Sequence, residues 1–516
     1  MLDFCLLKIY NYIVCYFYYI KEGVVVSFMV FSTLFFVFCF LTGFFLLYFL
    51  MPNIHLKNAL LIIASLLFYA WGEPVYVVLL LFSTVFNYLI GLSAGKFKDK
   101  VFGKITIIFS LIVNIGMLLL FKYSVFICDN LNAWFSLNLT APNIKGLFTD
   151  FLNTQFSLKI PHPSWCLPIG ISFYTFQAMS YTIDCYWDTV KPQKNYFKFL
   201  LYVSLFPQLI AGPIVRYSVI EEEISSRKIS AQDISKGATR FVVGLAKKVV
   251  LANNLYIIVD DFFSSDIKSL SVAATWYTVA IYALYVYFDF SGYSDMAIGI
   301  GNILGFHFNE NFNYPFICKD ITEFWQRWHI SLGTFFKDYL LYVPIFGKRR
   351  QTLSLFLVWF CTGAWHGASW NFIIWGLYFG TFIFIERLIG KKRIKKIPVV
   401  IRHIYNKIVI VVGFGIFYFE SLPDLGNFFK NLVGLNGNSL IDESLKINCM
   451  NNIFIIAVAV IACFPVTKLF KTDEESSYGK ICIVNTSKVF ITAALFVLCG
   501  ILMVDSTSNP FLYFRF

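Results

Sequence analysis

Long runs of apolar residues alternate with short polar segments along the whole chain. Many of these runs approach the roughly 17–25 residues that a helix needs to cross the hydrocarbon core of a bilayer. They lie at residues 30–51, 58–71 extended to 75–93, 105–127, 270–288, 352–361 continuing to 371–386, 408–419, 452–467 and 488–504. The pattern predicts an all-α polytopic membrane protein with about 11–13 membrane-spanning or re-entrant helices.

The composition agrees with this pattern. Of the 516 residues, 58% are hydrophobic and 14% are charged, whereas an average soluble domain has about 25% charged residues. The twelve cysteines show no CxxC or other metal-type spacing, and several, such as Cys39 and Cys463, lie in apolar runs. We therefore expect neither a disulfide framework nor a metal site.

The net charge of +12 is concentrated in two loops. Lysines crowd residues 96–104, and basic residues crowd 391–407 with no acidic residue among them. The positive-inside rule explains such clusters better than nucleic-acid binding, and it makes both loops cytoplasmic. Counting spans from this anchor places the end near residue 30 outside and makes 128–164 an external loop. Beyond residue 186, helix breakers leave the topology open.

The chain is expected to hold one membrane domain, residues 29–516. Residues 1–28 are aromatic-rich, include Lys8 and lack an A-x-A cleavage signal, so we interpret them as an N-terminal extension or as sequence upstream of a start at Met29. Residues 218–237 are mixed in charge and form the clearest exposed connection. Turn-forming residues in 421–451 predict a second loop.

The segment "CTGAWHGASWNF", residues 361–372, places a histidine in apolar surroundings. Gly363 and Gly367 lie four residues apart, and a pair of alanines repeats the spacing, so on a helix they form stripes that let another helix approach closely. His366 would then lie beside a tight helix crossing. An ionisable side chain at membrane depth indicates a functional site by default. The alternative is a neutral histidine that only hydrogen-bonds a neighbouring helix.

A second histidine lies in "ITEFWQRWHISLGTFFKDYLLY", residues 321–342. Trp325, Trp328 and His329 follow the i, i+3, i+4 spacing, which would place all three on one helical face. The mixture of charged and aromatic residues suits the membrane interface or a wet cleft, and an aromatic-belt helix with a snorkelling arginine explains it equally well. The basic "GKRR" at 347–350 either attracts phosphates or follows the positive-inside rule.

A third polar group follows in "YFDFSGYSDMAIGIGNILGFHFNENFNYPF", residues 287–316. Asp295, Gly299 and Asn302 fall on one helical face, and such a face needs a water-filled cavity or buried partners. The alternating Asp and Ser residues resemble the start of a calcium loop, but the bidentate Glu of the EF-hand pattern is absent at the required distance.

Helix-breaking residues interrupt the apolar segments 167–187 and 206–217. Pro168, Gly170, Pro207, Gly212 and Pro213 are tolerated at membrane depth where the backbone lines a cavity or is buried in protein. Ordinary helix ends with polar caps are the alternative explanation.

Seven motifs in order along the chain carry a family resemblance. They are "LLFYAWGEP", "PIGISFYTFQAMSYTIDCYW", "LFPQLIAGPIVRY", "DFSGYSDMAIGIGNILGFHFNENFNYPF", "FWQRWHISLGTFFKDYLLYVPIFGKRR", "TGAWHGASWNFIIWGLY" and "NPFLYFRF". From about Met29 to Phe516 the chain resembles the membrane-bound O-acyltransferase family, and within it the alginate O-acetyltransferases and related bacterial polysaccharide and cell-wall enzymes.

The resemblance implies a bundle of helices around a tunnel, in which an acyl group passes from a cytoplasmic thioester to a hydroxyl. By motif position, His366 corresponds to the catalytic histidine of the family and His329 to its second histidine motif. Gln326 departs from the pattern, because relatives often carry a second arginine there. The resemblance also implies a multi-pass protein of the inner, cytoplasmic membrane, with acetyl-CoA or an acyl carrier protein as donor and no bound cofactor. A polysaccharide would be the acceptor, and an extracytoplasmic esterase-fold protein of the SGNH type is the expected partner.

The chemistry of the reaction supports this assignment. A hydroxyl is a poor nucleophile at neutral pH and needs a base within hydrogen-bond reach, and a neutral imidazole is suited to that task. Because burial disfavours the imidazolium, we expect His366 to be neutral. The candidate catalytic residues are His366 and His329. The candidate substrate-binding residues are Asp289, Ser291, Tyr293, Asp295, Trp328, Lys337, Asp338, Trp365 and Asn371, and those for the phosphates of the donor are Lys348, Arg349 and Arg350.

Three other functions remain open from the sequence. The first is D-alanyl transfer towards teichoic acid from a carrier protein. The second, from a different class, is a transporter in which His366 and Asp295 relay protons, although no inverted repeat is visible. A scaffold for a polysaccharide synthase is the third and least specific possibility.

Overall fold

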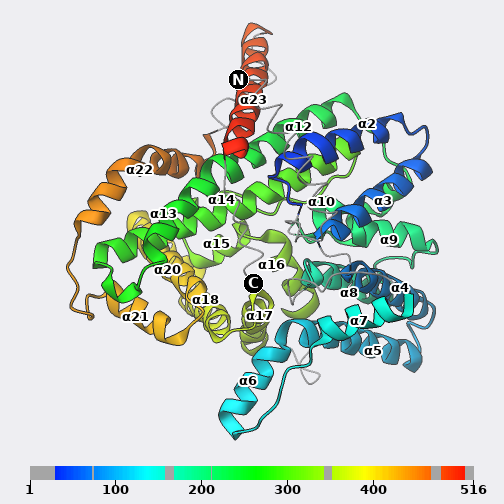
Figure 1. Ribbon diagram of the computed structural model, residues 1–516, viewed down its shortest axis with the longest axis horizontal. Helices are drawn as coiled ribbons and strands as arrows, with labels where there is room; N and C mark the ends of the chain where they lie inside the picture. The colour runs from blue at the N-terminus through cyan, green and yellow to red at the C-terminus, as the bar shows by residue number, and fades with distance from the viewer. Residues whose placement is uncertain are drawn as a thin grey trace. The chain divides into compact units, whose positions relative to one another are not determined.

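The computed structural model describes residues 29–72, 75–156, 168–210, 212–341, 351–466 and 478–505, and this part of the chain forms helices and no strands (Figure 1). Its contacts divide it into two compact units. Unit 1 holds the described residues up to Ala238 together with Ala297–Asn309, and unit 2 holds Thr239–Met296 and the described residues from Glu310 to Leu502. The predicted all-α membrane fold is confirmed. Residues 1–28 lie outside the described residues.

Unit 1 is a bundle of short and long apolar helices. Asn87 and Asn114 exchange side-chain hydrogen bonds of 3.0 and 2.9 Å between two of these helices, and such bonds join helices where lipid gives no hydrophobic driving force. The helices are α2 (Thr42–Leu50), α3 (Ile54–Gly72), α4 (Tyr76–Lys96), α5 (Val101–Leu118), α6 (Ser124–Phe135), α7 (Ile144–Phe156), α8 (Ile171–Tyr186), α9 (Tyr196–Ser204), α10 (Phe206–Leu209), α11 (Tyr217–Ser225) and the start of α12 (Ala231–Ala246).

The helix-breaking residues of unit 1 pack against each other. Gly170 precedes α8 in a left-handed conformation with φ 72°, and a β-carbon there would lie 2.6 Å from the carbonyl oxygen of Leu209. Nearly all side chains from Pro168 to Cys185 are buried. Of the explanations that the sequence left open, burial in protein therefore applies to this segment.

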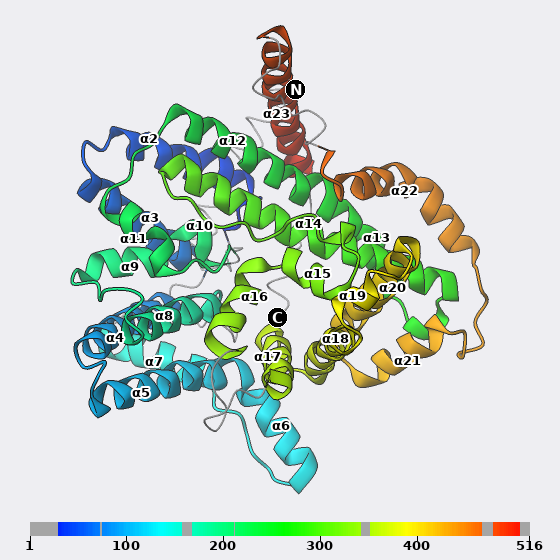
Figure 2. The ribbon, with the colours of Figure 1, turned by 180° about the vertical axis from the view of Figure 1, so that it is seen from behind.

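Unit 2 combines one very long helix with a set of shorter ones around an aromatic core (Figure 2). A π-helical stretch, Lys247–Ala252, joins α12 to α13. The last residues of α14 and α23 belong to unit 1. The helices are α13 (Asn253–Phe263), α14 (Val272–Leu304), α15 (Ile321–Arg327), α16 (Ile330–Phe336), α17 (Gln351–His366), α18 (Trp370–Ile389), α19 (Lys391–Ile394), α20 (Val399–Tyr418), α21 (Leu422–Leu432), α22 (Glu443–Ala462) and α23 (Tyr478–Asp505).

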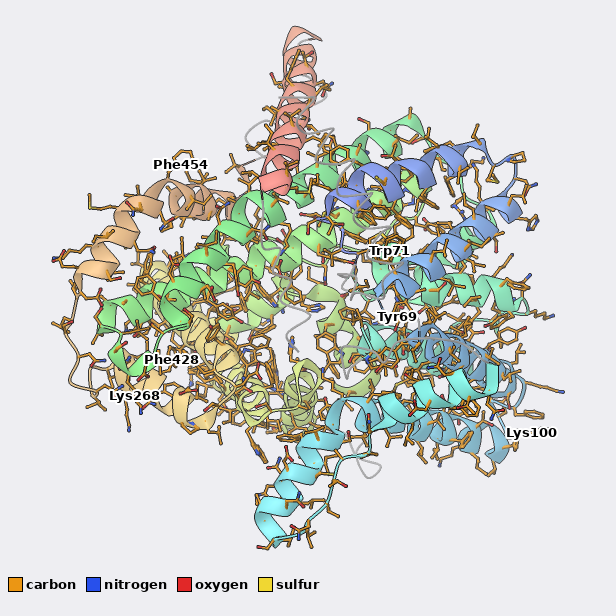
Figure 3. The ribbon with its side chains drawn as sticks, viewed as in Figure 1. Tyr69, Trp71, Lys100, Lys268, Phe428 and Phe454 are labelled. Atoms are coloured by element: carbon orange, nitrogen blue, oxygen red, sulfur yellow. The ribbon has the colours of Figure 1, made fainter. Side chains whose placement is uncertain are left out.

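Eight helical segments of the described chain are long and apolar enough to cross a membrane. Many of their apolar side chains point outward: Phe454 on α22 is 79% exposed, whereas Phe428 on α21 is fully buried (Figure 3). Outward apolar side chains of this kind suit a lipid environment. The segments are Ile54–Trp71, Tyr76–Lys96, Val101–Phe135, Ala231–Phe263, Trp370–Ile389, Val399–Tyr418, Glu443–Ala462 and Val484–Val504.

Two predictions about element boundaries were wrong. Residues 421–451 are not one loop, because they contain α21 and the beginning of α22; packing of the helices outweighs the local turn signals there. The apolar run from 352 to 386 is broken, since α17 ends at His366 and α18 begins at Trp370. Residues 218–237 form an exposed connection, as expected, and α11 and the start of α12 occupy most of it.

The α17–α18 hairpin depends on two glycines that face each other. A β-carbon on Gly363 would overlap the carbonyl oxygen of Phe372, and one on Gly376 would overlap that of Trp359. The two helices therefore approach at backbone distance, as small residues permit in membrane proteins. This contact confirms the predicted tight crossing beside His366.

Substitution of Gly376 by alanine should lower the melting temperature of the purified protein, because the new methyl group overpacks the hairpin at a cost of about 1–3 kcal/mol. Gly116→Ala is the matched control, because a β-carbon on this α5 glycine meets nothing within 4 Å, and alanine favours the helix. Thermal unfolding in detergent measures both variants. Equal melting temperatures for the two variants would contradict the close contact.

Candidate functional site

His366 is the last residue of α17, where the chain turns towards α18. A β-carbon on Gly367 would overlap the ring of Phe372, so this tight turn requires a glycine. The half-buried imidazole packs edge-on against Trp375 and Phe417, with ring centroids 4.8 and 5.1 Å away. Because the helix ends at His366, Gly367 does not continue the small-residue stripe of Gly363. The predicted stripe is correct only for the helical part.

His329 lies in the turn between α15 and α16 in a left-handed conformation, with φ 46° and ψ 51°. A non-glycine residue in this region is uncommon and is often found at functional sites. The ring is 4% exposed, and its Nδ1 has no hydrogen-bond partner among the described residues. This histidine lies outside the eight candidate spans, and burial lowers the pKa of its imidazole well below the usual value. The ring is therefore neutral at physiological pH.

The predicted helical face with Trp325, Trp328 and His329 does not exist, because α15 ends at Arg327 and the next two residues leave the helical conformation. The three side chains nevertheless border one cavity. Tertiary packing, and not a shared helical face, thus brings the three side chains together.

Both histidines border this aromatic-walled cavity within unit 2. The ring of Trp365 lies beside both, with centroids 4.9 Å from His366 and 5.8 Å from His329. The cavity encloses about 20 Å³, which is room for about one water molecule. The remaining lining side chains are apolar or aromatic: Val286, Phe290, Trp325, Trp328, Trp375, Phe379, Phe414 and Phe417.

Helix α14 supplies one wall of the cavity and the carboxylates predicted from the sequence. Val286 and Phe290 face the cavity, whereas Asp289 forms an ion pair of 2.6 Å with Lys248, and both of these side chains are buried. Asp295 pairs with Arg240 at 2.9 Å and with Lys247 at 2.6 Å. Both carboxylates therefore have cationic partners; the pair of Asp289 is buried, whereas Asp295 and its two cations are partly exposed.

These basic partners were not predicted from the sequence. Arg240, Lys247 and Lys248 lie seven and eight residues apart along the continuous helical segment Ala231–Phe263. The i, i+7, i+8 spacing of charges in an apolar run was the signal that could have identified them. Lys247 begins a π-helical stretch, a feature often found at functional sites.

The other candidate substrate-binding residues take varied positions. Ser291 and Tyr293 are buried on α14, Trp328 borders the cavity, and Trp365 lies beside both histidine rings. The side-chain amide of Asn371 donates to the carbonyl oxygens of Ile416 and Phe417, both at 3.2 Å, and so joins α18 to α20. Lys337 is exposed and Asp338 half-buried after α16, and neither borders the cavity. Lys348, Arg349 and Arg350 lie outside the described residues.

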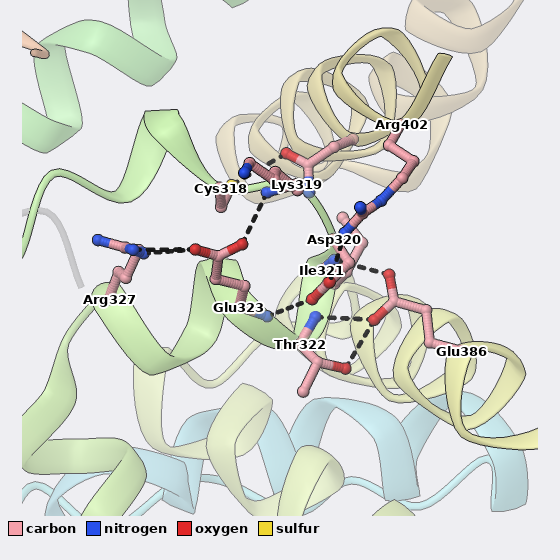
Figure 4. Close-up of polar contacts among 10 residues, drawn as sticks. Cys318, Lys319, Asp320, Ile321, Thr322, Glu323, Arg327, Glu386 and Arg402 are labelled. Atoms are coloured by element: carbon pink, nitrogen blue, oxygen red, sulfur yellow. Dashed lines mark hydrogen bonds and ion pairs between the residues drawn. The ribbon is translucent and has the colours of Figure 1, made fainter. Parts of the chain in front are cut away.

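Helix α15, which carries Trp325, is held from outside by a carboxylate on α18. Glu386 accepts hydrogen bonds from the backbone N–H groups of Ile321 and Thr322 at 2.7 and 2.8 Å, and from the Thr322 hydroxyl at 2.6 Å (Figure 4). The carboxylate thereby satisfies amides at the first turn that have no partner within the helix. Asp320 adds the usual N-cap bond to the amide of Glu323 at 2.7 Å. The aromatic wall is thus fixed by polar contacts on its other side.

That other side of α15 borders a basic cleft of about 710 Å³. Arg327 in the cleft pairs with Glu323, and Arg402 pairs with Asp320. Gln326, the departure from the family pattern, also lines this cleft and not the cavity with the histidines. Its remaining cations are Arg387 at the end of α18 and, from the basic segment expected to be cytoplasmic, Lys391 and Lys395. Among the described residues, no group of three metal-ligating side chains occurs.

Comparison with known proteins gives consistent results. Residues 105–422 match the family model described as MBOAT, membrane-bound O-acyltransferase family. The chain is 38% identical over 460 residues to the probable alginate O-acetylase AlgI of Pseudomonas aeruginosa, covering 88% of this chain and 84% of that protein. It is 32% identical over 542 residues to the peptidoglycan O-acetyltransferase of Helicobacter pylori, covering 95% and 98%. Similarity to the teichoic acid D-alanyltransferase of Bacillus subtilis is 32% over 225 residues, covering 41% and 56%.

Substitution of Lys248 by methionine should destabilise the protein by about 3–5 kcal/mol, because it leaves the Asp289 charge buried without its partner. A second substitution, Asp289→Leu, should restore most of this loss. The control is Glu443→Gln, since the Glu443–Lys446 pair is exposed and such pairs contribute little. Thermal and chemical unfolding provide the comparison, and a Lys248→Met protein as stable as wild type would contradict the role of the pair.

Proposed function

Because the chain belongs to the membrane-bound O-acyltransferase family, we propose that it transfers an acetyl group from a cytoplasmic thioester to hydroxyls of an exported polysaccharide or cell-wall polymer. The chain is an O-acyltransferase and a polytopic membrane protein. The relatives that cover most of it are named for acetylation of alginate or peptidoglycan. The D-alanyltransferase matches less than half of the chain, which favours acetylation over D-alanyl transfer. Membership of a family of O-acyltransferases also favours an enzyme over a transporter.

The observation that carries the proposal is the convergence of His329 and His366 on one small cavity whose other lining side chains are apolar or aromatic. A hydroxyl needs a base within hydrogen-bond reach before it attacks a thioester. Aromatic walls limit competing hydrolysis of the donor. Of the two imidazoles at this cavity, one can act as the base and the other can hydrogen-bond a substrate.

In the proposed reaction, His366 is the general base. The acceptor oxygen attacks the thioester carbonyl carbon while His366 takes the hydroxyl proton, and the carbon–sulfur bond then breaks. His366 returns the proton to the departing thiolate, so the products are an ester and a free thiol. His329 orients the donor: its buried Nδ1 has no partner among the described residues and keeps its hydrogen-bonding capacity for a ligand.

The size of the cavity supports acetyl as the transferred group. A space of about 20 Å³ accommodates a methyl-sized group, and each additional methylene would have to displace an aromatic ring from a packed wall. Phe379 is a suitable ring to test, because it borders the cavity, is 1% exposed and packs against Trp325 and Trp375 with centroids 4.9 and 5.4 Å away.

The proposal also assigns compartments and partners. The protein lies in the cytoplasmic membrane, and the donor, acetyl-CoA, approaches from the cytosol, where the positive-inside rule places the basic segment 391–407. The acyl group leaves towards the outside, where an esterase-fold protein completes its transfer to the polymer. No cofactor is retained, because the donor is consumed as a substrate.

His366→Ala should reduce acetyl ester on cell-surface polymers by about 100-fold to 10,000-fold, the range expected for loss of a general base. His329→Ala should also reduce it, and His55→Ala, at an exposed position at the start of α3, should not. The ester released by mild alkali from cells with equal amounts of each protein measures the effect. Wild-type ester content in His366→Ala cells would reject the catalytic assignment.

Phe379→Ala should let longer acyl groups enter the cavity, because an aromatic wall is removed. The rate with butyryl-CoA relative to acetyl-CoA should rise about tenfold or more, since discrimination of one methylene in an apolar pocket is worth that much. Phe428→Ala is the control: this ring is fully buried, does not border the cavity, and should leave the ratio unchanged. Thiol release by membranes supplied with polymer acceptor measures both rates, and an unaltered ratio in Phe379→Ala would refute the size limit.

A further inference from the structure

The second histidine of the site occupies the N-cap position of α16 but does not cap that helix. N-cap side chains normally accept a hydrogen bond from an amide of the first helical turn. His329 makes no such bond with its side chain. Its ring instead borders the cavity, so the cap must come from another residue.

Asn311 provides this cap from a distant part of the chain. Its side-chain oxygen accepts hydrogen bonds from the backbone N–H of Ser331 at 3.2 Å and from the Ser331 hydroxyl at 2.8 Å. Its backbone carbonyl accepts a hydrogen bond from the N–H of Ile330 at 2.9 Å. Both amides belong to the first turn of α16, which therefore begins correctly without help from the imidazole.

The same segment fixes the backbone on the other side of His329. The N–H of Asn313 donates to the carbonyl oxygen of Arg327 at 2.9 Å. Hydrogen bonds from one short segment thus flank His329, before and after it. A left-handed conformation in a residue with a large side chain persists only when its surroundings determine it. These bonds are the surroundings that do so.

Residue 311 also connects this turn to the wall of the cavity. The side-chain nitrogen of Asn311 donates to the Ser294 hydroxyl at 3.0 Å, and Ser294 lies on α14, the helix whose Val286 and Phe290 line the cavity. The ring of Phe312 packs against Trp328 with centroids 5.2 Å apart and against His329 at 6.1 Å. Asn311 itself is 2% exposed.

We propose that Asn311 is a positioning residue: it caps α16 in place of His329, holds that residue in its left-handed conformation, and so directs the imidazole into the cavity. The expected effect on catalysis rests on the proposed function, whereas the cap rests only on the hydrogen bonds of Asn311. Asn311 does not border the cavity and acts through His329.

A double-mutant cycle tests whether Asn311 acts through His329. Asn311→Ala should lower the rate of acetyl transfer about 100-fold in the wild-type background, as a misplacement of about 1 Å can. In the His329→Ala background it should cause no further loss. Asn311→Asp should retain activity within about fivefold, because aspartate is an equally good N-cap and can accept from the hydroxyls of Ser294 and Ser331.

Asn431→Ala is the matched control. Asn431 is 1% exposed on α21, and its amide donates to the carbonyl oxygens of Ile267 and Leu270 at 2.5 and 3.4 Å. This variant loses a buried side-chain amide that donates to two backbone carbonyl oxygens, and residue 431 lies far along the chain from both histidines. It should lower the melting temperature while the activity per folded molecule stays at the wild-type level. If Asn311→Ala does not accumulate, Ser331→Ala replaces it in the cycle, with an expected loss of about fivefold.

A second measurement does not depend on activity. In histidine-labelled protein, the ring signal of His329 is identified by its absence in His329→Ala. Asn311→Ala should shift this signal, and Asn431→Ala should leave it in place. An unshifted signal, or an equal loss of activity in both backgrounds, would overturn the positioning role. The proposed function would instead be rejected by a different pair of results: Asn311→Ala shifts the His329 signal, but the wild-type protein transfers no acyl group.

Discussion

The packed, largely aromatic core of unit 2 is the constraint on which its other features depend. A polar group in such an interior must find its partner within the protein, since an unsatisfied one costs free energy comparable to a lost hydrogen bond. Lys248 accordingly pairs with Asp289, and Glu386 accepts from first-turn amides of α15 that have no partner within the helix. The Nδ1 atom of His329 is one of several buried side-chain atoms of unit 2 that have no hydrogen-bond partner among the described residues, together with Trp325 Nε1 and Ser291 Oγ. Among these atoms, it belongs to a ring that borders the cavity, where a substrate could complete its hydrogen bonding.

The close approach of α17 and α18 converts this packed interior into a site. With only hydrogen atoms as side chains at Gly363 and Gly376, the two helices lie in backbone contact. His366 at the end of α17 therefore packs against Trp375 on α18, and the aromatic rings that surround both histidines leave little free volume. Rigid, densely packed walls serve two purposes in the proposed reaction: they exclude water from the thioester and restrict the acyl group to a small size.

Positioning in this protein is carried out by residues that do not touch the cavity. Glu386 caps α15 from α18, and Asn311 caps α16 from the segment that follows α14. Glu386 supplements the local cap Asp320, whereas Asn311 provides the cap that the local N-cap residue, the histidine at the cavity, does not provide. Short helices of seven residues are marginal by themselves, so the contacts from neighbouring elements decide their geometry.

The sequence by itself determined the membrane class, the helical architecture and the tight crossing beside His366, because hydropathy and small-residue spacing act over a few turns of one helix. It also singled out both histidines and the carboxylates of α14. Only the tertiary structure decided that His329 lies outside a helix, that Lys248 neutralises Asp289, and that α17 ends at His366. These features depend on contacts between residues far apart in the chain, such as Asn311 with Ser331 and Gly376 with Trp359. Local periodicity contains no information about such contacts, which form only when the helices pack.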